Sequence, residues 1–308
     1  MKGSGQTVKK KDSVFKEIWK NKAIYMIMLP GIAWFIIFAY GPMSGLQLAF
    51  KEYSTKLGIW GSHWCGMENF QYVFRDPSFL RSVGTTLWIN AGRLLFQFPI
   101  PIILALLFNE LRLKRYKKVV QTVLTFPQFL SWVIVASIVI NILSYDGLVN
   151  SIIAAFGGET INFMGSAGMF QPLLYITEDW KSAGWGAIIY MAAISGIDVD
   201  QYEAADLDGA TKWQQFWKIT IPNIAPSIFL VLIMTTIGSL KVFGQVKNLT
   251  NGGPGTASYV MVFYIYEMAF RSYKFGYASA ISVVLFLMIV GLTILQWNTR
   301  KRWIHYED

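Results

Sequence analysis

Long apolar runs separated by polar connections dominate the sequence, and six of them are about 20 residues long. A run of that length is enough for a helix to cross the hydrocarbon core of a bilayer. Helices are the expected form, because backbone groups in lipid must be paired within their own segment, and the short alternating strands of a membrane barrel are missing. The pattern therefore predicts an all-α integral membrane protein with six transmembrane helices: Ile24–Leu46, Thr85–Phe108, Val119–Leu143, Leu173–Ile194, Ile224–Gly244 and Ala278–Trp297.

Basic residues gather on one side of these six runs. Seven of the 27 lie before residue 23, five more lie in Arg112–Lys118, and three follow the last run at Arg300–Arg302. Cytoplasmic loops are enriched in Lys and Arg, so this side, with both termini, is predicted to face the cytoplasm of a bacterial cell. The connection Asp146–Gln171 has no Lys or Arg, as expected outside. The net charge of +9 therefore indicates topology and lipid contact rather than nucleic-acid binding.

Three regions follow from this arrangement. Residues 1–22 form a basic cytoplasmic segment, in which Phe15, Ile18 and Trp19 are spaced for a short interfacial helix on anionic lipid. A basic anchor that only fixes the topology is the alternative. Residues 23–300 form the transmembrane domain, and residues 301–308 form a cytoplasmic tail.

Several kinds of chemistry are not supported by the sequence. Cys65 is the only cysteine, which rules out an intrachain disulfide and a cysteine-based metal site. His63 and His305 fall on opposite predicted sides of the membrane. The phosphate-loop spacing G-x-x-x-x-G-K-[ST] is missing, so we expect no ATP hydrolysis and no cofactor on this chain.

The connection between the fourth and fifth runs is acidic, although it is predicted to be cytoplasmic. It carries five carboxylates and only two lysines: Asp198, Asp200, Glu203, Asp206, Asp208, Lys212 and Lys218. A short helix over residues 198–208 would place Gly209 where a C-terminal cap glycine belongs. This composition runs against the usual charge bias and indicates a docking surface for another protein, an ordinary solvated loop being the alternative.

Residues 198–222 resemble the cytoplasmic EAA loop of the permease subunits of ABC importers. That family has EAA, three residues, Gly, nine residues, Ile, one residue and Leu-Pro. In register here are Glu203, Ala204, Ala205, Gly209, Ile219 and Pro222, with Ile221 in place of Leu. Gly66–Phe70, Leu249–Pro254 and Gly276–Ala280 extend the resemblance to carbohydrate permeases of the MalF and LplB type, over residues 24–300.

The resemblance implies a fold, a mechanism and partners. The fold is the type I importer permease, and the EAA segment, with Asp208 beside its glycine, is a coupling helix in a cleft of a separate ATPase that holds ATP and Mg²⁺. Movement of that helix then opens the transport path alternately to either side. The implied partners are two ATPase subunits, a second, MalG-like permease, an extracellular solute-binding protein and a sugar or oligosaccharide.

Two further polar patches lie within predicted transmembrane runs, where ionisable residues usually face a bundle interior or a watery cavity. The fourth run carries Glu178, Asp179, Trp180 and Lys181, followed by Trp185. Glu178 and Lys181 are spaced to pair on one helix face. The resemblance places the sugar site in this stretch, whereas a later start of the helix would leave the patch at the outer interface.

The second patch lies in the fifth run and contains Ser239, Lys241 and Gln245. The resemblance makes it a second sugar-contacting stretch. Lys241 can instead pair with an acidic residue of the fourth run or extend toward the membrane surface. Together with Arg93 of the second run and Lys181, it favours an acidic, uronate-containing oligosaccharide.

Two other classes compete with an importer subunit. An integral-membrane enzyme acting on lipid-linked sugar would use Glu178 and Asp179 as acid and base, but adjacent helical side chains point about 100° apart. An ion-coupled secondary transporter would leave the EAA spacing unexplained. The substrate itself, its length and the identity of the partner subunits are not specified by the sequence.

Overall fold

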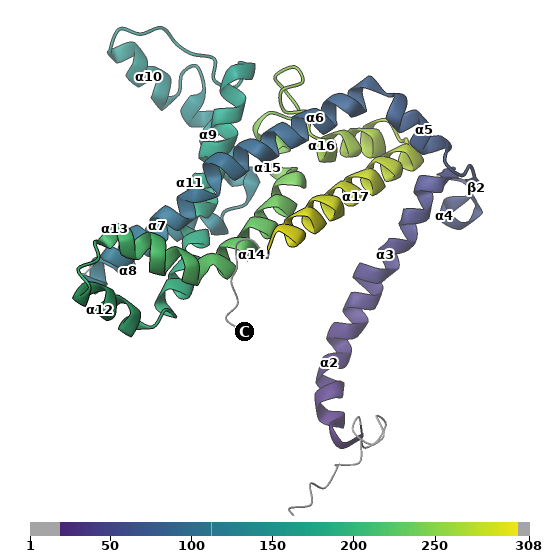
Figure 1. The fold of residues 1–308 in the computed structure, drawn as a ribbon. Helices are drawn as coiled ribbons and strands as arrows, with labels where there is room; N and C mark the ends of the chain where they lie inside the picture. The colour runs from purple at the N-terminus through teal and green to yellow at the C-terminus, as the bar shows by residue number, and fades with distance from the viewer. Residues whose placement is uncertain (1–18, 112, 301–308) are drawn as a thin grey trace, which may run out of the picture.

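The computed structural model describes residues 19–111 and 113–300, which form a bundle of long helices (Figure 1). The predicted interfacial helix before Trp19 and the tail 301–308 lie outside these residues. Five helical stretches are apolar and long enough to cross a membrane, and a sixth counts when the fourth run is taken together with the short helix that follows it. The helix of the fourth run carries three ionisable residues near its middle, and it is therefore less apolar than the other five stretches. The all-helical membrane fold is confirmed.

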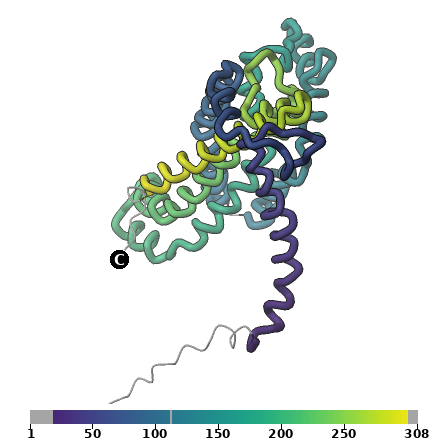
Figure 2. Tube along the Cα trace, turned by 90° about the vertical axis from the view of Figure 1, so that its right-hand side faces the viewer, coloured from purple at the N-terminus to yellow at the C-terminus, as the bar shows by residue number. Residues whose placement is uncertain are grey.

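The first run stands apart from the rest of the bundle (Figures 1 and 2). It is a continuous helical rod made of α2 (Lys22–Phe35), η1 (Ile36–Tyr40), α3 (Gly41–Met43) and η2 (Ser44–Phe50). No residue of α2 is buried, whereas η2 packs against the last helix. A short connection follows, with β1 (Lys51–Glu52), α4 (Gly58–Gly61), β2 (His63–Trp64) and α5 (Glu68–Arg75). The antiparallel pairing of β1 with β2 was not predicted.

The second run contains a π-helical turn in its middle. It begins at Pro77, eight residues before the predicted start, as α6 (Pro77–Gly92), continues through the π-helical turn η3 (Arg93–Gln97) and ends as α7 (Pro99–Glu110). Asp76 caps α6 by accepting a hydrogen bond from the Ser78 N–H. The π-helical turn adds a residue to the helix and directs Arg93 and Gln97 into the bundle, where both are buried.

The third run is not one helix, and the single span Val119–Leu143 is wrong. α8 (Lys114–Thr125) passes into the 3-10 turn η4 (Phe126–Phe129), and a new helix, α9 (Trp132–Leu143), begins after Ser131. Pro127 has no N–H for the helical ladder, and the Ser131 hydroxyl caps α9 by accepting from the Ile134 N–H. α10 (Leu148–Ala155) then lies at the far end of α9 (Figure 1).

The fourth and fifth runs meet at the cytoplasmic connection. α11 (Ala167–Ser195) is followed by α12 (Val199–Leu207), bent by 70° from it. The chain returns through α13 (Lys212–Gln215), the π-helical turn η5 (Phe216–Thr220) and α14 (Ile221–Leu240). α14 ends four residues before the predicted limit, because the backbone leaves the helix at Lys241 and resumes as α15 (Gly244–Leu249).

The last run, α17 (Phe275–Thr299), is preceded by α16 (Met261–Tyr266) and the π-helical turn η6 (Glu267–Arg271), which lie between α6 and α17 rather than crossing the bundle. The core consists of apolar clusters at different levels: one joins Phe79, Met261 and Ile281, and another joins Phe108, Tyr190 and Ile224. These clusters hold α5 and α12 at opposite ends of the bundle (Figure 1).

Candidate functional site

A cavity of about 440 Å³ lies where the π-helical turn of the second run, α11 and the break between α14 and α15 meet. Its lining includes seven of the nine residues predicted to contact substrate: Arg93, Glu178, Asp179, Trp185, Ser239, Lys241 and Gln245. Side chains that the sequence analysis had not assigned to a site also line it, among them Gln97, Trp132 and Ser182. Gln97 could have been assigned to a site because it is a polar residue inside an apolar run, whereas no pattern distinguished Trp132.

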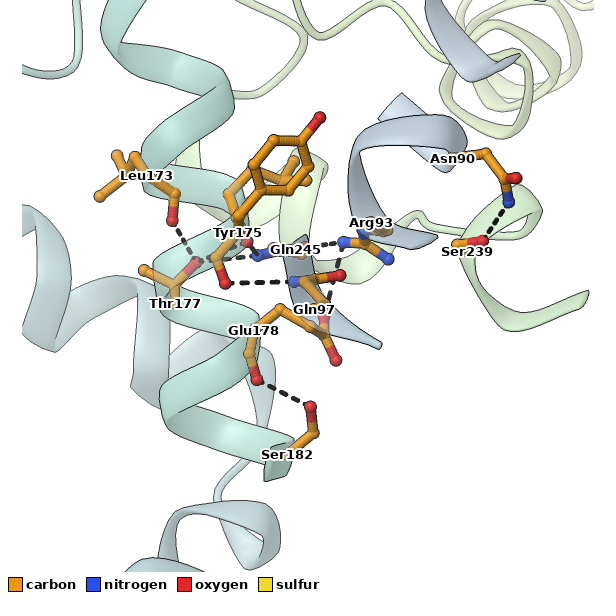
Figure 3. A network of polar contacts seen from close by, with 11 residues as sticks. Asn90, Arg93, Gln97, Leu173, Tyr175, Thr177, Glu178, Ser182, Ser239 and Gln245 are labelled. Atoms are coloured by element: carbon orange, nitrogen blue, oxygen red, sulfur yellow. Dashed lines mark hydrogen bonds and ion pairs between the residues drawn. The ribbon is translucent and has the colours of Figure 1, made fainter. Parts of the chain in front are cut away.

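Arg93 is the centre of a buried polar network that ties three helices together (Figure 3). Its Nη2 donates to Gln245 Oε1 and lies 3.5 Å from Glu178 Oε2. The Gln245 amide in turn donates to the Leu174 carbonyl at 2.7 Å and to Thr177 Oγ1 at 2.8 Å. Arg93 Nε is buried without a hydrogen-bond partner in the part of the chain that the structure describes. Because Gln245 is 1% exposed and bonded at both ends of its amide, its place in the network is structural.

Charge in the cavity is mixed. Glu178 is paired with Arg93. One turn further along α11, the Ser182 hydroxyl donates to the Glu178 backbone carbonyl at 2.8 Å. Asp179 and Lys241 line the same cavity, and neither makes an ion pair within the described ranges. The predicted pairing of Lys241 with an acidic residue of the fourth run is therefore not present. The cavity lining thus includes one lysine and one aspartate without an ion pair among the described residues.

Two predicted residues lie outside this cavity. The Lys181 side chain is buried, and its Nζ donates to the Gln128 carbonyl at 2.7 Å and lies 5.7 Å from the centre of the Trp132 ring. Lys181 therefore links α11 to η4. It does not pair with Glu178, as the spacing suggested, because the Glu178 carboxylate points toward Arg93 instead. Trp180 lines a separate apolar pocket with Ile142 and Ile176.

α12 has the structure expected of the predicted docking helix. Asp198 caps its start by accepting from the Asp200 N–H, and Gly209 follows its end with φ +73°. The Ala210 N–H bonds the Ala205 carbonyl at 2.9 Å and the Gly209 N–H bonds the Asp206 carbonyl at 3.1 Å, which is the glycine cap of a helix C-terminus. The cap predicted at Gly209 is confirmed.

The two faces of α12 differ. Tyr202 and Asp206 face the protein: the Tyr202 hydroxyl lies 2.9 Å from Thr220 Oγ1, and Asp206 accepts from Lys212 and Gln215. These bonds lower the pKa of Asp206 below its ordinary value, the bond from Gln215 most of all. Glu203, Ala204 and Asp208 are exposed, and between them Leu207 is 89% exposed. The exposure of Leu207 was not predicted, because no spacing rule distinguished this leucine from one in a buried position.

Comparison with known proteins places the chain in a family. The profile of the family described as "Binding-protein-dependent transport system inner membrane component" matches residues 97–304, about two thirds of the chain. The chain belongs to this family. It is a multi-pass inner-membrane permease component, and the family predicted from the EAA spacing is confirmed.

Similar proteins of this permease family cover most of the chain. Protein LplB of Bacillus subtilis is 39% identical over 279 residues, 90% of this chain and 87% of that protein. The polygalacturonan/rhamnogalacturonan transport system permease protein YteP of the same organism is 39% identical over 293 residues, 94% and 91% of the two chains. A chain in the crystal structure of a bacterial ABC transporter involved in the import of the acidic polysaccharide alginate is also similar. It has a TM-score of 0.84 at 34% identity and covers 94% of this chain and 98% of its own length. A chain in the crystal structure of a bacterial alginate ABC transporter in complex with an alginate pentasaccharide-bound periplasmic protein has the same identity and TM-score.

Proposed function

We propose that this permease carries a saccharide inward through the cavity at Arg93 and that the saccharide is an acidic oligosaccharide. The supporting observation is the cavity itself, in which an unpaired lysine lies close to aromatic rings and hydroxyl groups. Lys241 suits a sugar carboxylate, Asp179 and Ser182 suit hydroxyl groups, and the Trp132 and Trp185 rings suit the apolar faces of a sugar ring. The names of YteP and of the alginate transporter agree with a uronate-containing substrate.

The same family membership argues against the competing classes. An ion-coupled transporter or a lipid-linked-sugar enzyme needs neither the EAA spacing nor a docking helix with an exposed acidic and apolar face. Glu178 is also held by Arg93, which leaves it poorly placed to act as an acid with Asp179.

The energy for transport comes, in this proposal, from a partner ATPase that binds α12 and holds ATP and Mg²⁺. Glu203 and Asp208 offer charge to a basic surface, and Leu207, which is 89% exposed, offers an apolar contact. The 70° bend between α11 and α12 connects the docked helix directly to the helix that carries Glu178. Movement of α12 is therefore transmitted to the cavity through one continuous stretch of chain.

The other proposed partners follow from exposed surfaces. α2 has an apolar surface with no buried residue, which suits a second, MalG-like permease and the surrounding lipid. The end of the bundle opposite α12 suits an extracellular binding protein of the kind named for the alginate transporter. In this arrangement α12 and both termini face the cytoplasm of the bacterial cell, as the positions of the basic residues predict.

Uptake into proteoliposomes tests this proposal. The complex of this permease with its partner subunits is reconstituted, and uptake of an oligogalacturonate and of its carboxyl-reduced, neutral form is measured with ATP, without ATP and with an ion gradient. We expect uptake that requires ATP and is indifferent to the gradient. Uptake driven by the gradient alone would contradict the importer assignment.

Lys241→Met tests the acidic substrate separately. We expect it to reduce uptake of the oligogalacturonate at least tenfold and to change uptake of the neutral form little. Lys247→Met is the matched control, since Lys247 lies outside the cavity, 4.0 Å from the centre of the Tyr266 ring. Equal losses for the acidic and neutral forms would show that Lys241 does not recognise the carboxylate.

A further inference from the structure

A second pocket, of about 590 Å³, lies at the end of the bundle opposite α12. Its walls come from the connection after η2, from α5, from α16 with η6, and from the start of α17. It shares no lining residue with the cavity at Arg93. Its volume is in the range of pockets that hold small ligands, which are usually lined by aromatic rings with a few placed polar groups.

Six of its thirteen lining residues are aromatic: Tyr53, Tyr72, Tyr264, Tyr273, Phe275 and Tyr277. Tyr72 and Tyr273 are 63% and 72% exposed, so the faces of their rings are open to a ligand. Tyr53 and Phe275 pack edge to face at 5.3 Å, and the Phe275 ring also lies 6.5 Å from the Tyr273 ring, so these three rings form one continuous part of the wall. Aromatic side chains at the end of a membrane helix often contact lipid headgroups, but those residues stand on an outer surface, whereas these surround a hollow.

A carboxylate lies in this pocket. Asp76 Oδ2 accepts hydrogen bonds from the hydroxyls of Tyr264 and Tyr277, and its Oδ1 accepts from the Ser78 N–H at 2.8 Å. Burial alone would raise the pKa of Asp76, but the hydrogen bonds from Tyr264, Tyr277 and Ser78 lower it overall. The group is therefore an anion that accepts hydrogen bonds, and it disfavours a phosphate or a carboxylate as its neighbour.

Other charges in the pocket do not favour an anionic ligand. Glu52 adds a second acid, and Lys274 stands at the rim. Lys51 is buried, and its Nζ is held by the carbonyls of Ile59 and Trp60 at 2.8 and 3.3 Å. Only Lys274 is thus an available cation. Two carboxylates, Asp76 and Glu52, thus face one available lysine in this pocket.

Tyr273 has a backbone conformation that is unusual for its residue type. Its φ is +55°, in the left-handed region that residues with a Cβ rarely adopt. The turn is held by the Lys274 N–H, which bonds the Met268 carbonyl at 2.8 Å, and by the Ser272 N–H, which bonds the Glu267 carbonyl at 2.9 Å. Strained residues of this kind concentrate at ligand sites, where their placement has a use. Here the turn places the exposed Tyr273 ring in the pocket lining.

We infer that this pocket is a second saccharide site, which takes a neutral sugar residue between Tyr72 and Tyr273 with its hydroxyl groups toward Asp76. The C–H face of a sugar ring packs on tyrosine rings, while hydroxyl groups donate to the carboxylate. The site rests on its own geometry and does not depend on which ligand the cavity at Arg93 takes.

Saturation-transfer NMR on the complete complex in nanodiscs tests this site. The probes are maltotriose, cellotriose and α-1,4-galactotriose at millimolar concentration, with trigalacturonate as the acidic comparison and empty nanodiscs as the blank. We expect transfer to the ring protons of at least one neutral trisaccharide. Transfer to none of the three, equal transfer from empty nanodiscs, or stronger transfer to trigalacturonate would overturn the inference.

Variants locate the signal. Tyr273→Gly removes the ring and suits the positive φ, so the fold is retained, and a thermal unfolding curve checks this. We expect it and Tyr72→Ala to reduce transfer at least fivefold. Trp60→Ala, which removes an exposed ring outside the pocket, should leave transfer unchanged, as should Lys241→Met in the other cavity. Unchanged transfer in Tyr273→Gly, or its loss in Lys241→Met, would overturn the inference.

Discussion

The pair Arg93–Glu178 should stabilise the bundle far more than an ion pair on its surface. The two charged atoms are 3.5 Å apart, and the side chains are 6% and 26% exposed. At an effective dielectric constant of 20, that distance corresponds to a Coulomb attraction of about 5 kcal/mol. Desolvation of both groups offsets much of it. We therefore expect a coupling free energy of about 1–3 kcal/mol in a double-mutant cycle.

The cycle uses Arg93→Met, Glu178→Gln and the double variant. Arg93→Met should lower the free energy of unfolding by about 3 kcal/mol, because it leaves the partly buried Glu178 carboxylate without its cation and removes the donor to Gln245. Glu178→Gln keeps an acceptor and the shape of the side chain and should cost about 1 kcal/mol. Because Glu178→Gln removes the charge that Arg93→Met strands, the double variant should cost less than the sum.

The assay is unfolding in mixed micelles, followed by tryptophan fluorescence, which gives the free energy of unfolding of each variant. The pair Arg271–Glu267 is the matched control: its atoms are closer, at 2.7 Å, but its side chains are 49% and 19% exposed and lie four residues apart on one helical turn. Its coupling should stay near 0.5 kcal/mol. If the coupling of Arg93 with Glu178 is no larger than that, burial does not strengthen this pair and the reasoning is wrong.

Three more predictions follow from other features. Gly209→Ala should lower the free energy of unfolding by about 1–2 kcal/mol, because residue 209 has a φ of +73°. Gly209→Pro or Glu203→Lys should abolish ATP-dependent uptake while the protein stays in the membrane. Gly209→Asn should retain most of the uptake. Gly184→Ala should lower the free energy of unfolding by about 1–3 kcal/mol, since its Cβ would lie 2.2 Å from the Leu124 carbonyl oxygen. The control is Gly291→Ala, whose Cβ meets nothing within 4 Å and which should change the free energy of unfolding very little in the same assay. The pKa of Asp76 is lowered in the folded protein, so the stabilisation that Asp76 contributes is complete above the ordinary carboxyl pKa of about 4. This stabilisation is lost as the pH falls through the lower pKa of the folded state. Asp76→Asn should therefore flatten the pH dependence of the free energy of unfolding in that range.

Periodicity and motif spacing predicted the larger part of the architecture. Runs of about 20 apolar residues mark membrane helices because the bilayer core has a fixed thickness, and α17 lies within three residues of its predicted limits. The Gly209 cap followed from the need for positive φ at the end of a helix. Both signals are local, so they can be read without knowing what lies nearby.

Interactions between distant segments were beyond this reading. Glu178 and Lys181 are spaced to pair, yet Glu178 reaches Arg93 and Lys181 reaches the Gln128 carbonyl. Both outcomes depend on how the second and third runs pack against α11, which no local pattern encodes. The interruption at Pro127 was visible as a proline, but a proline inside an apolar run marks either a kink or a new helix, and the Ser131 cap decides between them.

The interruption between α14 and α15 has a consequence for solvent. Within the described ranges, no backbone N–H donates to the carbonyls of Lys241 and Val242, which lie at the level of the Arg93 network. Hydrocarbon offers no donors, so these oxygens suit hydroxyl groups that enter the cavity. A sugar in the cavity would therefore exchange hydrogen bonds to water for hydrogen bonds to the backbone, which lowers the free-energy cost of leaving water.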